Sequence, residues 1–279
     1  IKLKAKTKPA TFEASARRNV AYLIESVGDK DMTTYTSLDA GSFRDYLLDK
    51  ELAGASVKRI FSSIKAIYNL AASEHGLDGK NPFAKVYFPE TNDTKTRRPA
   101  TEAELSMIQT ECISINDEIR WLIALVSDTG MRLSEAAGLY WTDVQLDGEI
   151  PHIIIQPNAH RRLKTASSER IIPVVGFSLW ALKQAKAHAT GPYVYPKYMK
   201  GTTCAANSAS AATNKWIKSL VNSDISMHSL RHSMRDRLRS AQCPTEVIDQ
   251  IGGWSSGSVG SKYGLGYPLH ILREWMLKM

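Results

Sequence analysis

The chain has 279 residues, of which 43% are hydrophobic and 23% charged, a composition typical of globular proteins. It holds no run of about 18 uncharged apolar residues of the kind that spans a membrane. Its three cysteines, Cys112, Cys204 and Cys243, are too few and too scattered for a disulfide framework or a zinc cluster, which favours a reducing, intracellular setting. The net charge of +8 permits a polyanionic partner, but it also suits a protein that is merely soluble.

The first part of the chain is predicted to be an arm followed by helices. Residues 1–10 (IKLKAKTKPA) carry four lysines and no acid, and we interpret them as a linker or arm. The stretch 12–77 has a helical pattern, clearest in SVKRIFSSIKAIYNLAASEHGL, where apolar residues recur at i, i+3, i+4 and i+7. Lys58 and Lys65 lie seven residues apart, away from that apolar stripe. These two lysines could contact phosphates, or they could simply be solvent-exposed residues of the polar face.

A domain boundary is predicted near residue 95. Residues 91–99 (TNDTKTRRP) are polar and charged and end in proline, which is typical of a linker. Thr101 and Glu104 then fit a capping box that begins a new helix. We therefore expect domains at 11–94 and 95–279, joined by this linker.

The second part is predicted to combine helices with a small sheet. Helices are expected within 101–139 and at 177–186, 209–221, 229–240, 245–251 and 268–278. Residues 152–156 (HIIIQ) and 170–175 (RIIPVV) are rich in β-branched residues and follow turn signals at 147–148 and 157–158. We predict an antiparallel sheet of two or three strands, and hence a mainly α fold with a small antiparallel β-sheet (α+β).

Three common catalytic motifs are missing from the sequence. It contains no G-x-x-x-x-G-K-[ST] phosphate loop, no H-E-x-x-H zinc pattern and no G-x-S-x-G nucleophile elbow. ATP hydrolysis, zinc proteolysis and α/β-hydrolase chemistry therefore lose most of their support.

Four segments carry candidate functional residues, although each alone has an ordinary structural explanation. An Arg and a Glu three residues apart usually form a surface ion pair, a lysine between two strands is usually solvated, and a lone tyrosine usually packs. The helix HSLRHSMRDRLRSA is more unusual, because its crowded positive groups favour a polyanion. The residues in question are Arg132 and Glu135, Lys164, His228 and Arg231 with Arg235 and Arg239, and Tyr263.

Taken together, in this order and spacing, the segments resemble the catalytic boxes of the tyrosine recombinases, the phage-integrase family. The family pattern is T-G-x-R-x-x-E, a lysine in a β-hairpin, H-x-x-R, a His or Trp after a glycine, and a tyrosine about nine residues later. The resemblance runs from about residue 12 to 270, and 43–83 is similar to the family's helical core-binding domain. The matching residues are Arg132 with Glu135, Lys164, His228 with Arg231, Trp254 in GGW, and Tyr263.

This resemblance implies DNA strand exchange through a 3′-phosphotyrosine, with neither ATP, metal nor other cofactor. Arg132 and Arg231 would bind the non-bridging phosphate oxygens, with Glu135 orienting its neighbours. Tyr263 would be the nucleophile, and His228 would share its proton or bond a phosphate oxygen. Lys164 would protonate the leaving 5′-oxygen.

The last box departs from the commonest family pattern at one position and offers two tyrosines. Trp254 stands where many members have His, so no proton-transfer role is assigned to it; its indole N–H can still donate to a phosphate oxygen. Tyr267 is a competing nucleophile, but the spacing from Trp254 favours Tyr263.

The resemblance also implies partners and a location. We expect a two-domain clamp around double-stranded DNA with inverted core half-sites, a homotetramer on that DNA, accessory DNA-bending proteins as further candidates, and no membrane. The C-terminal tail (GYPLHILREWMLKM) is expected to dock on a neighbouring protomer rather than on its own domain. The location is expected to be the bacterial cytoplasm, at the nucleoid or in a phage-infected cell. Candidate DNA contacts are Lys58, Lys65, Lys95, Arg97, Arg98 and Arg235.

Other functions remain as alternatives at this point. A type IB topoisomerase-like relaxase would use similar chemistry without exchanging partners, and a non-catalytic DNA-binding protein could use the same fold. A metal-dependent nuclease or transposase would need clustered carboxylates, which the sequence does not offer.

Overall fold

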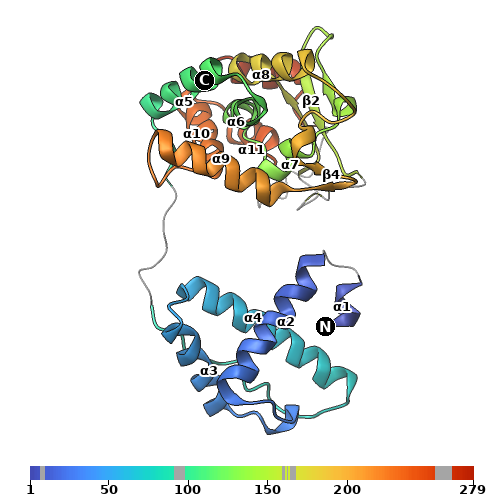
Figure 1. Cartoon of the computed structure of the whole chain (residues 1–279), viewed down its shortest axis with the longest axis vertical. Coiled ribbons are helices and arrows are strands. Elements are labelled where there is room, and N and C mark those ends of the chain that lie inside the picture. Colours follow the sequence, from blue (N-terminus) through green and yellow to red (C-terminus); the bar gives the residue numbers. More distant parts are fainter. Residues whose placement is uncertain (7–9, 91–97, 159–160, 162, 164–167, 255–265) are drawn as a thin grey trace. The chain divides into compact units, whose positions relative to one another are not determined.

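The chain divides into two compact units in the computed structural model, Ile1–Thr96 and Arg97–Met279 (Figure 1). The structure describes residues 1–6, 10–90, 98–158, 161, 163, 168–254 and 266–279. Within these ranges, no helix is long and apolar enough to cross a membrane.

The first unit is a small helical domain. Its helix α2 contacts α3 and α4, which also contact each other. Phe43 and Leu47 of α3 meet Val57 and Phe61 of α4 in the core, and Phe83 closes it from the chain that follows. The elements are α1 (Lys2–Ala5), α2 (Ala10–Val27), η1 (Met32–Thr34), α3 (Ser37–Asp49) and α4 (Gly54–Glu74).

The sequence pattern accounts for α4, whose predicted apolar stripe is the buried face. Lys58 is exposed and Lys65 is half-buried on that helix. The start of the chain differs from the prediction, because Lys2–Ala5 forms a helical turn closed by a bond from the Ala5 N–H to the Ile1 carbonyl.

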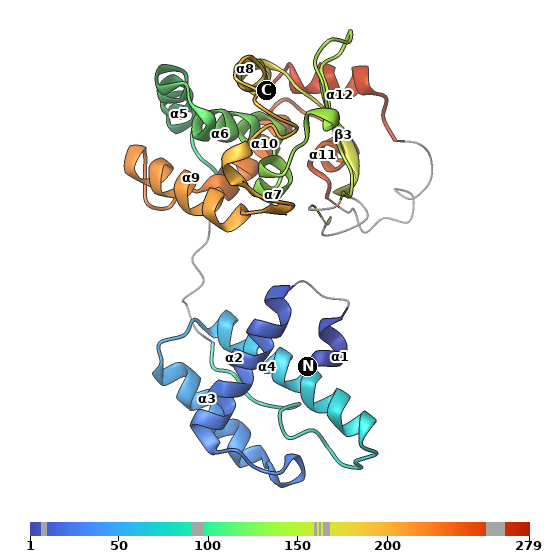
Figure 2. The same cartoon turned by 45° about the vertical axis from the view of Figure 1, so that its right-hand side comes forward.

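The second unit is built around α6. Figures 1 and 2 show this helix at the centre of the unit, and it contacts α5, α7, α8, α9 and α10. Every residue of 121–129 is buried, which explains its nearly continuous apolar sequence. The helices are α5 (Glu102–Ile115), α6 (Glu118–Thr129), α7 (Leu133–Ala137), α8 (Gly176–Ala187), α9 (Ala206–Leu220), α10 (Met227–Ser240), α11 (Thr245–Gly252) and α12 (Leu269–Met276).

An antiparallel sheet covers one side of these helices. Strand β2 (His152–Ile155) lies between β1 (Val144–Gln145) and β3 (Arg170–Pro173). Ile153 is opposite Ile172 in the β2–β3 pair, and both are buried. The prediction of a mainly α fold with a small antiparallel sheet is confirmed. The remaining short elements are η2 (Trp141–Asp143), η4 (Pro196–Tyr198), β4 (Met199–Lys200) and β5 (Thr203–Cys204).

The two ends of the second unit are held by specific contacts. The predicted capping box at α5 is confirmed, because the Thr101 hydroxyl accepts from the Glu104 N–H and the Glu104 carboxylate accepts from the Thr101 N–H. At the other end, α12 packs on its own unit through Leu272 and Met276, which are buried in the core. The C-terminal helix thus docks in cis in this chain.

Candidate active site

Arg132 and Glu135 are organised by the start of α7. The Glu135 carboxylate accepts from the Arg132 backbone N–H at 3.0 Å and from Arg132 Nη1 at 2.7 Å. Gly130 makes the preceding turn with φ of +59°, and a Cβ there would overlap the Met234 side chain. The T-G-x-R-x-x-E spacing therefore fixes both the backbone and the guanidinium of Arg132.

Arg170, on β3, completes this arrangement from the opposite side. Its Nη2 lies 3.0 Å from Glu135 Oε2, and its Nε donates to the Ile251 carbonyl at 2.8 Å. Burial alone raises the pKa of Glu135, but Arg170 and Arg132 outweigh burial and hold that pKa below its usual value. Glu135 is therefore an ionised carboxylate shared by two guanidiniums.

Ser168 links the same arginines to the chain that leads into β3. Arg132 Nη1 donates to the Ser168 hydroxyl at 2.8 Å, and Arg170 Nη1 donates to the Ser168 carbonyl at 2.6 Å. This end of the β2–β3 connection is thus fixed against the Arg132 guanidinium. Lys164, in the same connection, lies outside the described residues.

Arg231 joins the cluster from α10. It donates to the Gly130 carbonyl through Nη1 and to the Gly252 carbonyl, at the end of α11, through Nη2 at 2.6 Å. The residue is only 4% exposed. Burial, followed by repulsion from Arg170 and Arg132, lowers the pKa of Arg231 to about 9, so the group stays charged at neutral pH. Its positive charge also complements the carbonyl end of α11.

Trp254 and Arg235 lie beside Arg231. The guanidinium carbons of Arg231 and Arg235 are 4.3 Å and 4.6 Å from the centroid of the Trp254 ring. Arg235 also pairs with Asp249 of α11 at 3.2 Å. His228 is exposed at the start of α10, and the centroid of its ring lies 4.7 Å from that of the His232 ring.

The structure brings some of the predicted residues together and not others. Arg132, Glu135, Arg231 and Trp254 belong to one connected cluster through the contacts above. Tyr263, Lys95 and Arg97 lie outside the described residues. Arg98 donates both Nη groups to Glu104 at 2.7 Å, so it supports the α5 cap in this structure rather than presenting an open guanidinium.

The basic helix α10 also differs from the open positive face that its sequence suggests. Arg231 is buried, and Arg237 pairs with Asp128 at 3.1 Å. Only Arg239 is largely exposed among the arginines of α10, and it pairs with Asp236. Much of the positive charge of α10 therefore forms hydrogen bonds and ion pairs within the second unit.

Sequence reasoning missed Arg161, Arg170 and Asp249. Arg161 pairs with Asp143 at 2.8 Å with both side chains buried, and it also donates to the Gly138 carbonyl at 3.1 Å. A sequence signal existed for Arg170, because it occupies an inward position of an otherwise apolar strand. A charge at such a position predicts a buried partner.

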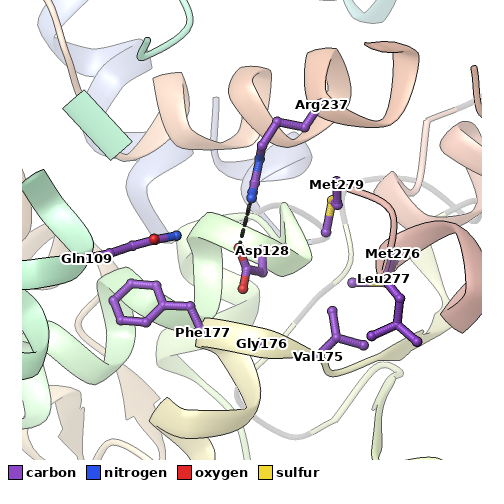
Figure 3. Close-up of a pocket in the computed structure, with 9 residues that line it drawn as sticks. All are labelled: Gln109, Asp128, Val175, Gly176, Phe177, Arg237, Met276, Leu277 and Met279. Carbon is purple, nitrogen blue, oxygen red and sulfur yellow. Dashed lines mark hydrogen bonds and ion pairs between the residues drawn. The ribbon is translucent and has the colours of Figure 1, made fainter. Parts of the chain in front are cut away.

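A separate cavity of about 270 Å³ lies at the end of α12 (Figure 3). Arg237 and Asp128 form an ion pair at its wall. Because Met276, Leu277 and Met279 of the C-terminal segment also line it, this cavity belongs to the packing of the tail, and it shares no lining residue with the arginine cluster.

Comparison with known proteins identifies the family. A family model described as "Phage integrase family" matches residues 100–264, and the chain therefore belongs to the phage integrase family. The tyrosine recombinase XerC of Pediococcus pentosaceus is 25% identical over 267 residues, which cover 90% of this chain and 83% of the relative. The integrase of Salmonella phage P22 is 23% identical over 80% of this chain and 57% of the relative.

Solved structures share the fold. The Tn1549 transposon integrase in complex with transposon right end DNA gives a TM-score of 0.69 at 18% identity, covering 98% of this chain and 95% of that one. A lambda integrase tetramer bound to a Holliday junction gives 0.68 at 17% identity, covering 93% and 73%.

With the family match, these relatives make the chain an enzyme of the site-specific tyrosine recombinase class. A relaxase or a non-catalytic DNA-binding protein is not favoured.

Proposed function

We propose that this recombinase cleaves DNA through Tyr263 and rejoins it to a new partner strand. The phenol oxygen of Tyr263 attacks the phosphorus, and the bond from phosphorus to the 5′-oxygen breaks. The products are a 3′-phosphotyrosine and a free 5′-hydroxyl. Attack by the 5′-hydroxyl of a second strand reverses these steps and releases the tyrosine, so the bond energy is conserved without ATP.

The observation that carries this proposal is the connected cluster of Arg132, Glu135, Arg170 and Arg231. It holds more positive than negative charge, and Arg132 keeps 26% of its side chain exposed. A phosphodiester gains charge on its non-bridging oxygens in the transition state, and fixed guanidinium donors stabilise that charge. Among the described residues, two of the five N–H donors of Arg231 contact carbonyls, and the remaining donors suit a phosphate.

Proton transfers are assigned to the lysine and histidine of the predicted set. We assign protonation of the 5′-oxygen to Lys164, since Ser168 anchors the end of its connection to Arg132. His228 is assigned to receive or share the Tyr263 proton, and its exposure on α10 leaves it accessible to DNA. The step then needs a general acid and a base supplied by side chains alone.

The partners follow from the same proposal. We assign double-stranded DNA with inverted half-sites as the substrate, contacted through exposed basic residues such as Lys58, and a homotetramer as the active assembly. The solved lambda integrase tetramer on a Holliday junction supports this assembly. Integration or excision of a phage or mobile element in the cytoplasm, aided by DNA-bending proteins, is the corresponding role.

Covalent capture tests the proposal. Wild type and Tyr263→Phe are incubated with a nicked genomic DNA library in EDTA, denatured, and the attached DNA is sequenced. We expect adducts only with wild type, clustered at an inverted repeat, while both proteins bind DNA. An adduct that survives in Tyr263→Phe rejects the assignment of the nucleophile, and no adduct from either protein rejects the proposed chemistry.

A further inference from the structure

The indole of Trp254 lies between two guanidiniums and against a glycine. Arg231 and Arg235, one helical turn apart on α10, both contact the ring, at 4.3 Å and 4.6 Å from its centroid. A Cβ at Gly252 would overlap the six-membered ring of the indole. The space for this large side chain is therefore made by a glycine and two flat cationic groups.

Asp249 holds the outer of these two guanidiniums. Its carboxylate lies 3.2 Å from Arg235 Nη2, and its backbone carbonyl accepts from the Trp254 N–H at 3.0 Å. Asp249 is itself only 8% exposed. One residue of α11 thus contacts both the tryptophan backbone and the arginine that stacks on the tryptophan ring.

Arg235 is held within its own unit on two sides. Its guanidinium carbon lies 4.6 Å from the Trp254 ring centroid, its Nη2 pairs with Asp249 at 3.2 Å, and its Nε is buried. A guanidinium stacks on an aromatic face through its plane, whereas a lysine ammonium is a point charge without such a plane. The shape of the side chain at 235 therefore matters in addition to its charge.

We propose that Arg235, held by Asp249, is a positioning residue that keeps the Trp254 indole against Arg231 for contact with the phosphate. This inference rests on the proposed function, in which Trp254 donates to a phosphate oxygen. It replaces the role of direct DNA contact that the sequence suggested for Arg235.

Conservative variants separate positioning from DNA binding. Arg235→Lys keeps the positive charge but loses the flat group, and Asp249→Asn removes the negative charge that holds Arg235. For both we expect single-turnover cleavage about tenfold slower, a loss that lies between the values of an exposed and a desolvated cation–π contact. DNA affinity and its salt dependence should stay within about twofold of wild type, because neither variant removes a positive charge. Asp249→Asn removes a negative charge, and Arg235→Lys keeps a positive one.

A double-mutant cycle tests the route of the effect. In the Trp254→Ala background, Arg235→Lys should slow cleavage by less than about twofold, because the residue acts through the missing indole. Arg120→Lys is the matched control outside the site, since the Arg120 guanidinium also lies over a tryptophan ring, that of Trp216 at 4.7 Å, and pairs with Asp117 at 2.9 Å. It should cleave at the wild-type rate.

The outcomes distinguish this inference from the function on which it rests. The substrate is the duplex recovered by covalent capture with wild type, and melting temperatures confirm that each variant is folded. Wild-type cleavage with an unchanged Arg235→Lys rate, or a loss of DNA affinity that accounts for the slower cleavage, overturns the inference alone. An equal effect of Arg235→Lys with and without Trp254 also overturns it. Absence of wild-type cleavage overturns the proposed function and the inference together.

Discussion

At the residue scale, the site depends on one buried carboxylate. Glu135 accepts hydrogen bonds from Arg132 and Arg170, and its own pKa is held low by them. Three guanidiniums without a carboxylate would repel one another in a buried setting. Glu135 therefore sets the positions of Arg132 and Arg170, while the three guanidiniums together leave a surplus of positive charge for a phosphate.

Replacing Glu135 with Gln should cost both stability and catalysis. Removal of one partner from a buried ion pair costs about 3–5 kcal/mol, because the remaining charge is left uncompensated. We expect a lower free energy of unfolding by denaturant and slower cleavage, with DNA affinity retained. Glu169→Gln, at an exposed neighbouring position, is the control and should match wild type. Equal stabilities of the Glu135 and Glu169 variants would show that the cluster does not hold the fold.

At the element scale, local sequence rules predict most of the structure. The stripe in SVKRIFSSIKAIYNLAASEHGL predicts α4, the Thr101–Glu104 pair predicts the start of α5, and β-branched runs predict β2 and β3. Each of these depends on residues close in sequence, where periodicity and capping chemistry decide the outcome.

The parts that sequence did not predict depend on distant contacts. Arg170 bonds to Glu135, which lies 35 residues away in the sequence. Arg235 contacts Asp249 and Trp254 because α10 packs against α11. Arg98 pairs with Glu104, a contact that its place in the polar linker sequence does not predict. A side chain's type predicts what it can bind, but tertiary packing decides which partner it meets.

The cap of α5 should make stability depend on pH. Arg98, with the backbone and hydroxyl of Thr101, lowers the pKa of Glu104 from 4.5 to about 2. A carboxyl with a lowered pKa adds stability above about pH 4.5 and loses that contribution as the pH falls toward 2. Glu104→Gln keeps the capping-box geometry, since Gln also serves at this position, but it loses the charge that pairs with Arg98. It should therefore lower stability at pH 7 by about 1 kcal/mol, the upper value for a partly exposed ion pair, and weaken the decline of stability in acid.

Thermal melting from pH 7 to pH 3 measures this effect. Glu102→Gln is the control, since Glu102 is exposed in the same turn of α5, and its curve should run parallel to wild type. Parallel curves for Glu104→Gln and wild type would mean that the ionised Glu104 and its pairing with Arg98 add no stability.

At the scale of the whole molecule, the question is which surface the C-terminal helix α12 packs on. α12 packs in cis here, with Leu272 and Met276 each 1% exposed and Leu277 55% exposed. The sequence analysis favoured docking on a neighbouring protomer. In the single chain, the apolar face of the helix is already covered by its own unit.

Cis packing predicts a stability effect in the free monomer. Leu272→Ala should lower the free energy of unfolding by about 2–5 kcal/mol, as for other buried leucines, and the loss should be the same at low and high protein concentration. Leu277→Ala should change it by less than about 0.5 kcal/mol. Chemical unfolding over a range of concentrations measures this. A concentration-dependent loss would show that the helix already docks on a second copy.

If Tyr263 is the nucleophile, its phenol oxygen becomes covalently joined to a DNA 3′-phosphate. Mass spectrometry of the captured adduct after nuclease and trypsin digestion detects this bond. The tryptic peptide 263–273 contains Tyr263 and Tyr267, and fragmentation separates them. We expect a nucleotide linked through its 3′-phosphate to Tyr263. A nucleotide on Tyr267, or a linkage through a 5′-phosphate, would contradict it.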